Sequence, residues 1–155
     1  PSGPTVLPRG KLATIGQPKT PIYYVCGGAE GDDSSLRPKS GIIVFPDVWG
    51  LGNLRTQLIC DAYANNNHQV VLFDPFRGET KADHEDTVAW LSSVPYEPNV
   101  KDDVAGCIEY PVEKGVDKSN ISSVGFCWGC WAIAKCSAES SPFRCAVWAH
   151  PSTGI

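Results

Sequence analysis

The sequence has 155 residues, of which 42% are hydrophobic, and it carries a formal net charge of −4 with a pI near 5.3. This length predicts one hydrophobic core, and we expect an irregular arm over residues 1–10 and one α/β domain over residues 11–155. The acidic balance gives no electrostatic basis for binding nucleic acid or an anionic membrane. No apolar run is as long as a membrane span, and the first residues lack a signal-peptide pattern.

The seven cysteines are an odd number and follow no disulfide-framework spacing. Four of them lie inside apolar patterns, where buried thiols are common: Cys60, Cys107, Cys136 and Cys145. A reducing compartment is therefore favoured, and we predict a cytoplasmic location. We predict no cofactor and no metal site. A zinc site at Cys127 and Cys130 would need two further ligands at matching spacing, and none is found.

Three strands are expected in the first part of the chain. Residues 11–15 and 21–26 predict an antiparallel hairpin at a sheet edge, joined by a turn around residues 16–18. Residues 27–40 read as a polar connection. Residues 41–45 form a continuous apolar run, which is typical of a central parallel strand covered on both faces.

A strand–helix–strand unit follows. Asn53 is expected to cap a helix whose apolar stripe comprises Leu54, Leu58, Ile59 and Ala62. Residues 69–73 predict a second buried strand. Repetition of such units predicts a parallel, doubly wound sheet.

The middle of the chain predicts two helices before the last strands. Residues 84–86 open a short helix that runs through Trp90. A second helix covers residues 100–108, and Pro111 is expected to end or kink it early. Near the end, residues 143–149 predict one more buried strand.

Residues 121–138 contain the most informative pattern of the sequence. A β-prone run is followed by Gly125-Phe126-Cys127-Trp128-Gly129 and then by an apolar helical segment. This pattern matches Gly-x-nucleophile-x-Gly, with cysteine where serine is commoner. The turn strains its central residue, so the flanking positions must lack colliding side chains. The helix N-terminus favours a thiolate, and the pattern predicts Cys127 as a nucleophile on a strand–turn–helix elbow.

Other polar residues are expected at the same sheet edge, because right-handed crossovers bring the ends of parallel strands together. Asp74 is predicted to cap a turn. For Asp47, the sequence is equally consistent with a role in the site and with a role in capping its own loop. His150 either lines the pocket or bonds its own loop. His68 is expected at the opposite edge with a structural role, and His84 is expected to be solvated.

Three tryptophans are expected to wall an apolar pocket: Trp49, Trp128 and Trp131. Trp131 is equally consistent with plain core.

Four segments of the chain carry a family resemblance in their order and spacing: residues 41–50, 70–76, 125–129 and 149–152. They resemble the dienelactone hydrolase family, a cysteine-nucleophile branch of the α/β-hydrolases. The resemblance is greatest to its eukaryotic members. The resemblance implies a three-layer α/β-hydrolase fold with a mostly parallel sheet. It also implies hydrolysis of a small ester or lactone through Cys127 and a thioester intermediate.

The same resemblance implies roles for further residues. The backbone N–H groups of Trp128 and Val48 would hold the oxyanion. Asp47 matches an acidic residue that lies close to the nucleophile and influences its protonation. The family's arginines that bind a substrate carboxylate have no clear counterpart here, and Arg77 is a loose match to them. From their positions, Trp49 and His150 are expected to line the substrate pocket with it.

The chain departs from the family's triad order of nucleophile, acid and histidine. After Cys127 it has no aspartate, only Glu139 as a glutamate, and only His150 as a histidine. We therefore expect either that a C-terminal third is absent from this sequence, or that the protein is a catalytically silent relative acting as a structural or binding subunit.

Two further expectations stand beside these. The spacing of Cys127 and Cys130 also fits a dithiol redox protein. In addition, a strand over residues 143–149 would leave one edge of the sheet unpaired. We expect a further segment or a partner, such as a second copy, to cover it.

Overall fold

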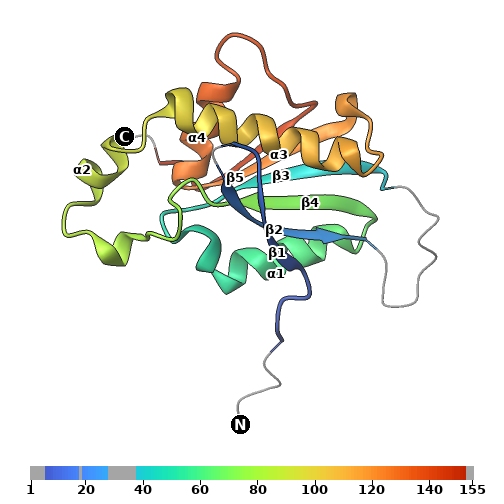
Figure 1. Cartoon of the computed structure of the whole chain (residues 1–155), viewed down its shortest axis with the longest axis horizontal. Coiled ribbons are helices and arrows are strands. Elements are labelled where there is room, and N and C mark those ends of the chain that lie inside the picture. The colour runs from blue at the N-terminus through green and yellow to red at the C-terminus, as the bar shows by residue number, and fades with distance from the viewer. Residues whose placement is uncertain (1–5, 18, 28–37, 153–155) are drawn as a thin grey trace.

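The computed structural model describes residues 6–17, 19–27 and 38–152. Pro18 of the predicted hairpin turn and residues 28–37 of the predicted polar connection lie outside the described residues. Figure 1 shows a single sheet with helices on both of its faces.

Within the described residues the sheet has six strands in the order β1-β2-β4-β3-β5-β6. Their bounds are β1 (Lys11–Ile15), β2 (Thr20–Cys26), β3 (Ser40–Phe45), β4 (His68–Phe73), β5 (Ile121–Phe126) and β6 (Ala146–Ala149). β2 pairs antiparallel with both β1 and β4, whereas β4, β3, β5 and β6 run parallel. The predicted edge hairpin and the mostly parallel sheet are therefore confirmed.

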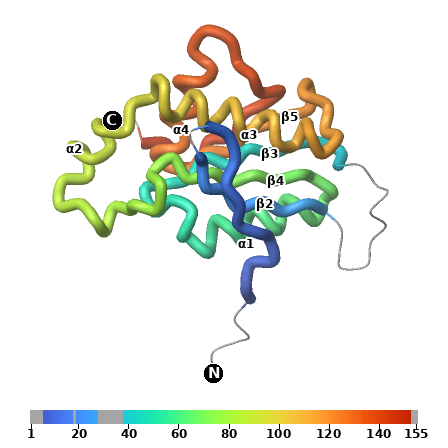
Figure 2. The backbone as a smooth tube through the Cα atoms, viewed as in Figure 1, coloured from blue at the N-terminus to red at the C-terminus, as the bar shows by residue number. Residues whose placement is uncertain are grey.

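The helices form the outer layers of the fold. They are α1 (Leu54–Ala64), α2 (Thr87–Ser92), α3 (Lys101–Glu113) and α4 (Trp128–Cys136), with short turns η1 (Gly50–Gly52), η2 (Lys81–Asp83), η3 (Tyr96–Val100) and η4 (Lys118–Asn120). Figure 2 shows α1 on one side of the sheet and α3 on the other. Of the helices in the described ranges, none has both the length and the apolar character that crossing a bilayer requires.

Each face of the sheet carries its own core. Tyr23, Val44 and Leu72 pack with Cys60 and Ala64 of α1 on one face. A larger cluster on the other face joins alternate residues of the same strands to α3 and α4. Because the central strands are buried on both faces, their sequences are continuous apolar runs rather than alternating ones.

Helix α1 begins where it was predicted, but it buries a different face. Asn53 Oδ1 accepts the N–H of Arg55 at 3.1 Å, which confirms the cap. The buried residues are Thr56, Cys60, Asp61 and Ala64, so the predicted apolar stripe is wrong. The Asp61 carboxylate accepts the hydroxyl of Tyr23 from β2, and this contact fixes the rotation of the helix.

Helix α3 continues through Pro111 to Glu113, so the prediction that the proline ends it early is wrong. The proline lies in the last turn, so only two helical residues follow the position where its ring and missing N–H disturb the helix. Its buried ring packs toward Gly41 of β3, where an added Cβ would lie 3.3 Å from the ring.

Strand β6 is shorter than predicted and is exposed rather than buried. Val147 and Trp148 are 54% and 51% exposed, because β6 is the edge strand of the described sheet. Phe143, which precedes β6 in the predicted segment, is the residue that reaches the core. Its ring lies 5.9 Å from that of Phe45.

Candidate active site

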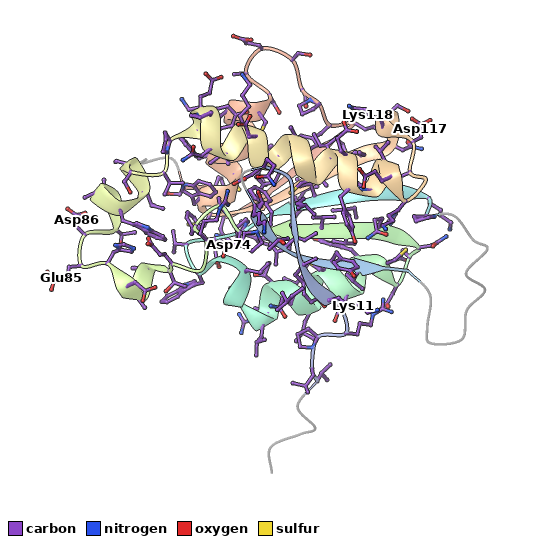
Figure 3. The ribbon with its side chains drawn as sticks, viewed as in Figure 1. Lys11, Asp74, Glu85, Asp86, Asp117 and Lys118 are labelled. Atoms are coloured by element: carbon purple, nitrogen blue, oxygen red, sulfur yellow. The ribbon has the colours of Figure 1, made fainter. Side chains whose placement is uncertain are left out.

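The carboxyl ends of the four parallel strands bring four predicted residues to one edge of the sheet. Taken in their order across the sheet, β4 is followed by Asp74, β3 by Asp47, β5 by Cys127 and β6 by His150. Figure 3 shows Asp74 at this edge, far from Asp117 and Lys118 before β5. Cys127 therefore follows the strand that lies between the strands of Asp47 and His150.

Cys127 occupies the strained turn that its sequence predicts. Its φ is 51° and its ψ is −109°, outside the regions that non-glycine residues favour. A Cβ at Gly125 would lie 2.9 Å from the amide nitrogen of Cys130, and one at Gly129 would lie 2.4 Å from the carbonyl oxygen of Phe45. Both glycines are therefore required for α4 to start directly after β5 and against the end of β3.

The loop after β6 is bonded to this turn. The N–H of Cys127 donates to the carbonyl of Ala149 at 3.2 Å, and the N–H of Ser152 donates to the carbonyl of Cys127 at 3.3 Å. His150 lies within this loop with a φ of 42°, and its exposed ring is 6.1 Å from the ring of Phe126. An imidazole is thus held next to the strand that carries the half-buried thiol.

Two backbone donors that follow the ends of β3 and β5 are unused. Neither the N–H of Trp128 nor that of Val48 has an acceptor within the described residues. The N–H of Gly50 donates to the carbonyl of Asp47 at 3.1 Å, and this carbonyl shares its peptide plane with the N–H of Val48. Because the two groups of a trans peptide point in opposite directions, the Val48 N–H points away from Gly50.

The Asp47 carboxylate caps its own loop. Its Oδ1 accepts the N–H of Trp49 at 2.9 Å, and its Oδ2 accepts the side-chain amide of Asn53 at 3.1 Å. The carboxylate is therefore tied to the residue that caps α1, while it lines the cleft described below.

Asp74 caps the turn after β4, as predicted. Its Oδ1 accepts the N–H of Phe76 at 3.0 Å and its Oδ2 accepts that of Gly78 at 2.7 Å. Burial raises the pKa of the Asp74 carboxyl above its usual range.

A cleft of about 500 Å³ opens at this edge, and we call it the elbow cleft. Its walls include Asp47, Trp49, Asn53, Thr56, Phe126 and His150. Cys127 itself does not line the elbow cleft, although the preceding residue, Phe126, does. A second hollow of about 350 Å³ shares Trp49 with the elbow cleft and is also lined by Leu51, Asp74 and Arg77.

Arg77 is not brought to the elbow cleft. Its guanidinium makes two hydrogen bonds to Asp103, at 2.9 and 2.7 Å, and a third to the carbonyl of Asp74 at 2.8 Å. Asp103 is buried and also accepts the hydroxyl of Thr20. The guanidinium of Arg77 thus links α3 to the end of β4, and the Asp103 carboxylate extends this network to Thr20 of β2.

The predicted tryptophans lie in different environments. Trp49 is 46% exposed and borders both hollows. Trp128 is fully buried, with its ring 4.8 Å from Phe76 and 5.5 Å from Trp131, so it belongs to the core and does not wall a pocket. Trp131 is half-buried and packs against the same core.

His68 lies at the opposite edge, as predicted, where its Nδ1 is 2.8 Å from the hydroxyl of Ser40. His84 is not simply solvated, because its ring stacks on Trp90 with centroids 4.6 Å apart and its Nε2 lies 3.0 Å from Glu79 Oε2. Glu79 was not singled out from the sequence. A lone glutamate in a polar loop gives no signal of its partners.

Cys130 is used as a core residue. Its thiol donates to the carbonyl of Gly125 at 3.1 Å and lies 3.5 Å from that of Ala149. Burial raises the pKa of the Cys130 thiol, and all seven cysteines are free. The arrangement therefore gives little support to dithiol chemistry with Cys127.

The sequence model of the dienelactone hydrolase family matches residues 11–155. No curated protein sequence matches the chain. The structure is similar to that of a candidate dienelactone hydrolase from Klebsiella pneumoniae subsp. pneumoniae MGH 78578, with a TM-score of 0.69 and 20% identity over 88% of this chain and 57% of that one.

It is also similar to esterase 2 of Thermogutta terrifontis phosphoramylated by tabun, with a TM-score of 0.59 and 17% identity over 97% of this chain and 59% of that one. For the acylaminoacyl peptidase of Pyrococcus horikoshii the TM-score is 0.63 and the identity 12%, over 94% of this chain and 23% of that one. These likenesses confirm the predicted fold class. The chain spans less than two thirds of the length of these structures.

Proposed function

Because this chain belongs to the dienelactone hydrolase family, we propose that it hydrolyses a small ester or lactone with Cys127 as the nucleophile. The observation that carries the proposal is the strained turn at Cys127, which begins α4 at the carboxyl edge of the sheet. Strain of this kind persists where the surrounding structure fixes it, and it clusters at functional positions.

In the first step the Cys127 sulfur attacks the carbonyl carbon of the ester. A C–S bond forms, and the carbonyl electron pair moves to oxygen, where the N–H groups of Trp128 and Val48 bind it. Donors that are already oriented stabilise this charge without reorganisation. When the intermediate collapses, the C–O bond breaks, and the alkoxide leaves with the proton that the thiol gave up.

In the second step water attacks the thioester. A C–O bond forms, the C–S bond breaks, and the carboxylic acid leaves while the thiol regains a proton. Asp47 and His150 border the elbow cleft on either side of Phe126, and we assign the transfer of these protons to them.

A test of this proposal combines acyl trapping with two matched variants. The full chain is mixed with p-nitrophenyl acetate, and intact mass spectrometry follows the adduct while absorbance follows the released phenolate. We expect one acetyl group per chain, located on Cys127. Acetylation should be absent in Cys127→Ala and retained in Cys130→Ala, since Cys130 is buried in the core. An equal loss in both variants would instead favour dithiol chemistry.

One observation favours a silent structural or binding subunit as the second candidate. No carboxylate of the described chain is hydrogen-bonded to His150, so nothing there orients its imidazole as a base. Failure of activated esters to acylate Cys127 would favour this second candidate.

A further inference from the structure

We propose that Glu79 and His84 are positioning residues, which hold the loop after β3 so that the Val48 N–H faces the reacting carbonyl oxygen. This inference rests on the proposed function, because it concerns the oxyanion of the same reaction. It begins from a backbone hydrogen bond between two loops that are far apart in sequence. The N–H of Lys81 donates to the carbonyl of Val48 at 2.9 Å.

That hydrogen bond fixes one of two consecutive peptide planes. The peptide between Val48 and Trp49 is held at its carbonyl by Lys81 and at its N–H by the carboxylate of Asp47, at 2.9 Å. The preceding peptide is held at its carbonyl by Gly50, at 3.1 Å. The Val48 N–H is the remaining polar group of the pair, and it has no acceptor in the described ranges. Its direction is therefore set by its neighbours.

The donor Lys81 lies in a turn that is closed around it. Thr80 and Asp83 form a reciprocal cap, in which the Asp83 carboxylate accepts the N–H of Thr80 at 2.8 Å and the Thr80 hydroxyl accepts the N–H of Ala82 at 3.2 Å. These bonds shape the turn η2. They do not attach it to the rest of the protein.

The attachment is made by Glu79 and His84, which flank the turn, together with Trp90 of α2, and we call these three residues the clasp. Glu79 Oε2 lies 3.0 Å from His84 Nε2 and accepts the indole N–H of Trp90 at 3.1 Å. The His84 ring stacks on Trp90 with an interplanar angle of 12°. Trp90 is 5% exposed and packs at 4.8 Å from Phe76 of the core. The clasp thus anchors both ends of η2 to the core.

The first measurement does not depend on catalysis. Hydrogen exchange should show the Lys81 amide protected in the parent and exchanging at least tenfold faster in Glu79→Ala. Glu79→Gln should recover part of the protection, since its carbonyl oxygen can still accept a hydrogen bond. The control is Glu85→Ala, because Glu85 is exposed and lies beside Asp86 at the outer margin of the molecule (Figure 3). Unchanged protection in Glu79→Ala would overturn the proposal.

The second measurement separates positioning from a general loss of structure. Alkylation of Cys127 by iodoacetamide passes through no oxyanion, whereas acylation by p-nitrophenyl acetate does. We expect Glu79→Ala to slow acylation by roughly 10- to 100-fold, below the full loss of one oxyanion donor, with little change in KM. Its alkylation rate should stay within twofold of the parent. His84→Gln should behave in the same way, which guards against misfolding of a single variant.

Equal acylation rates in the parent and in both clasp variants would disprove the positioning role. A parallel fall in alkylation and acylation would also disprove it, since that pattern indicates damage to the turn at Cys127. If the parent is not acylated at all, the proposed function itself fails. The catalytic role of the clasp then falls with it, even where the Lys81 amide loses protection.

Discussion

The N–H of Cys127 donates to the carbonyl of Ala149, and the residue after that carbonyl, His150, shares with Cys127 a positive φ. The two φ values are 51° and 42°. Two adjacent parallel strands are therefore each followed by a strained non-glycine residue, and the residues on either side of His150, Ala149 and Ser152, are hydrogen-bonded to the backbone of Cys127. Neither residue is a glycine, although glycine would adopt both conformations without strain, and strain of this kind clusters at functional positions.

The strain at Cys127 predicts an unusual order of stability. Cys127→Gly should be more stable than Cys127→Ala by about 1 kcal/mol, because only glycine adopts this conformation freely. Within a regular helix the order is the reverse. The pair Glu109→Gly and Glu109→Ala, at an exposed position inside α3, supplies that control. Urea unfolding of the four variants decides the matter, and a Cys127→Ala protein at least as stable as Cys127→Gly would contradict the strain.

The glycines of the elbow should be intolerant of a methyl group. Gly129→Ala should lower the free energy of unfolding by roughly 2 kcal/mol, because the new Cβ would lie 2.4 Å from the carbonyl oxygen of Phe45. Gly52→Ala is the matched control, since a Cβ there meets nothing within 4 Å. Thermal and urea unfolding measure both variants. Similar losses in the two would show that the close approach of α4 and β3 is not tight.

The sheet and the elbow are the parts that the sequence predicts well. Apolar runs such as residues 41–45 and 69–73 read correctly as central strands, since burial on both faces leaves no room for polar residues. The elbow at Cys127 is readable because steric demand limits its flanking positions to glycine. Both features depend on local constraints.

Features set by distant partners were not predictable. The rotation of α1 follows from the contact of Asp61 with Tyr23, 38 residues apart. Arg77 resembles a substrate ligand in sequence, yet it bonds Asp103, 26 residues ahead. Two of the hydrogen bonds that orient the Val48 N–H, from Gly50 to Asp47 and from Lys81 to Val48, join backbone groups, so no side-chain pattern encodes them. Pairings of this kind appear only once the chain is folded.

Removal of Arg77 and removal of Asp103, the two partners of one ion pair, should lower the free energy of unfolding by different amounts. The Asp103 side chain is 1% exposed and that of Arg77 is 34% exposed. Arg77→Ala leaves a buried carboxylate with Thr20 as a remaining hydrogen-bond donor and should cost about 3 kcal/mol. Asp103→Ala leaves a guanidinium that water can reach, so it should cost less.

A double-mutant cycle by urea unfolding measures this asymmetry. Glu109→Gln serves as its control, because the pair of Glu109 and Lys118 is more than half exposed on both sides and its loss should leave stability unchanged within error. If Asp103→Ala proves the more damaging of the two variants, then the burial of Asp103 does not govern the pair.

His68 should make stability depend on pH near neutrality. Burial, with a smaller contribution from the charge of Lys39, lowers the pKa of His68 below its ordinary value of 6.5. Between the lowered pKa and 6.5 the unfolded chain binds a proton that the folded chain does not, so stability rises with pH across that window. Above it the contribution of His68 is complete, and below it the contribution is lost.

Denaturant unfolding from about pH 5 to about pH 8 tests this dependence. The difference in unfolding free energy between the parent and His68→Asn should increase with pH and then level off near the ordinary pKa. Lys39→Gln should make the rise smaller without abolishing it, since burial is the larger cause. If the difference in unfolding free energy stays constant or falls as pH increases, the prediction is wrong. The folded protein would then accommodate the charged imidazole beside Ser40 at least as well as the neutral one.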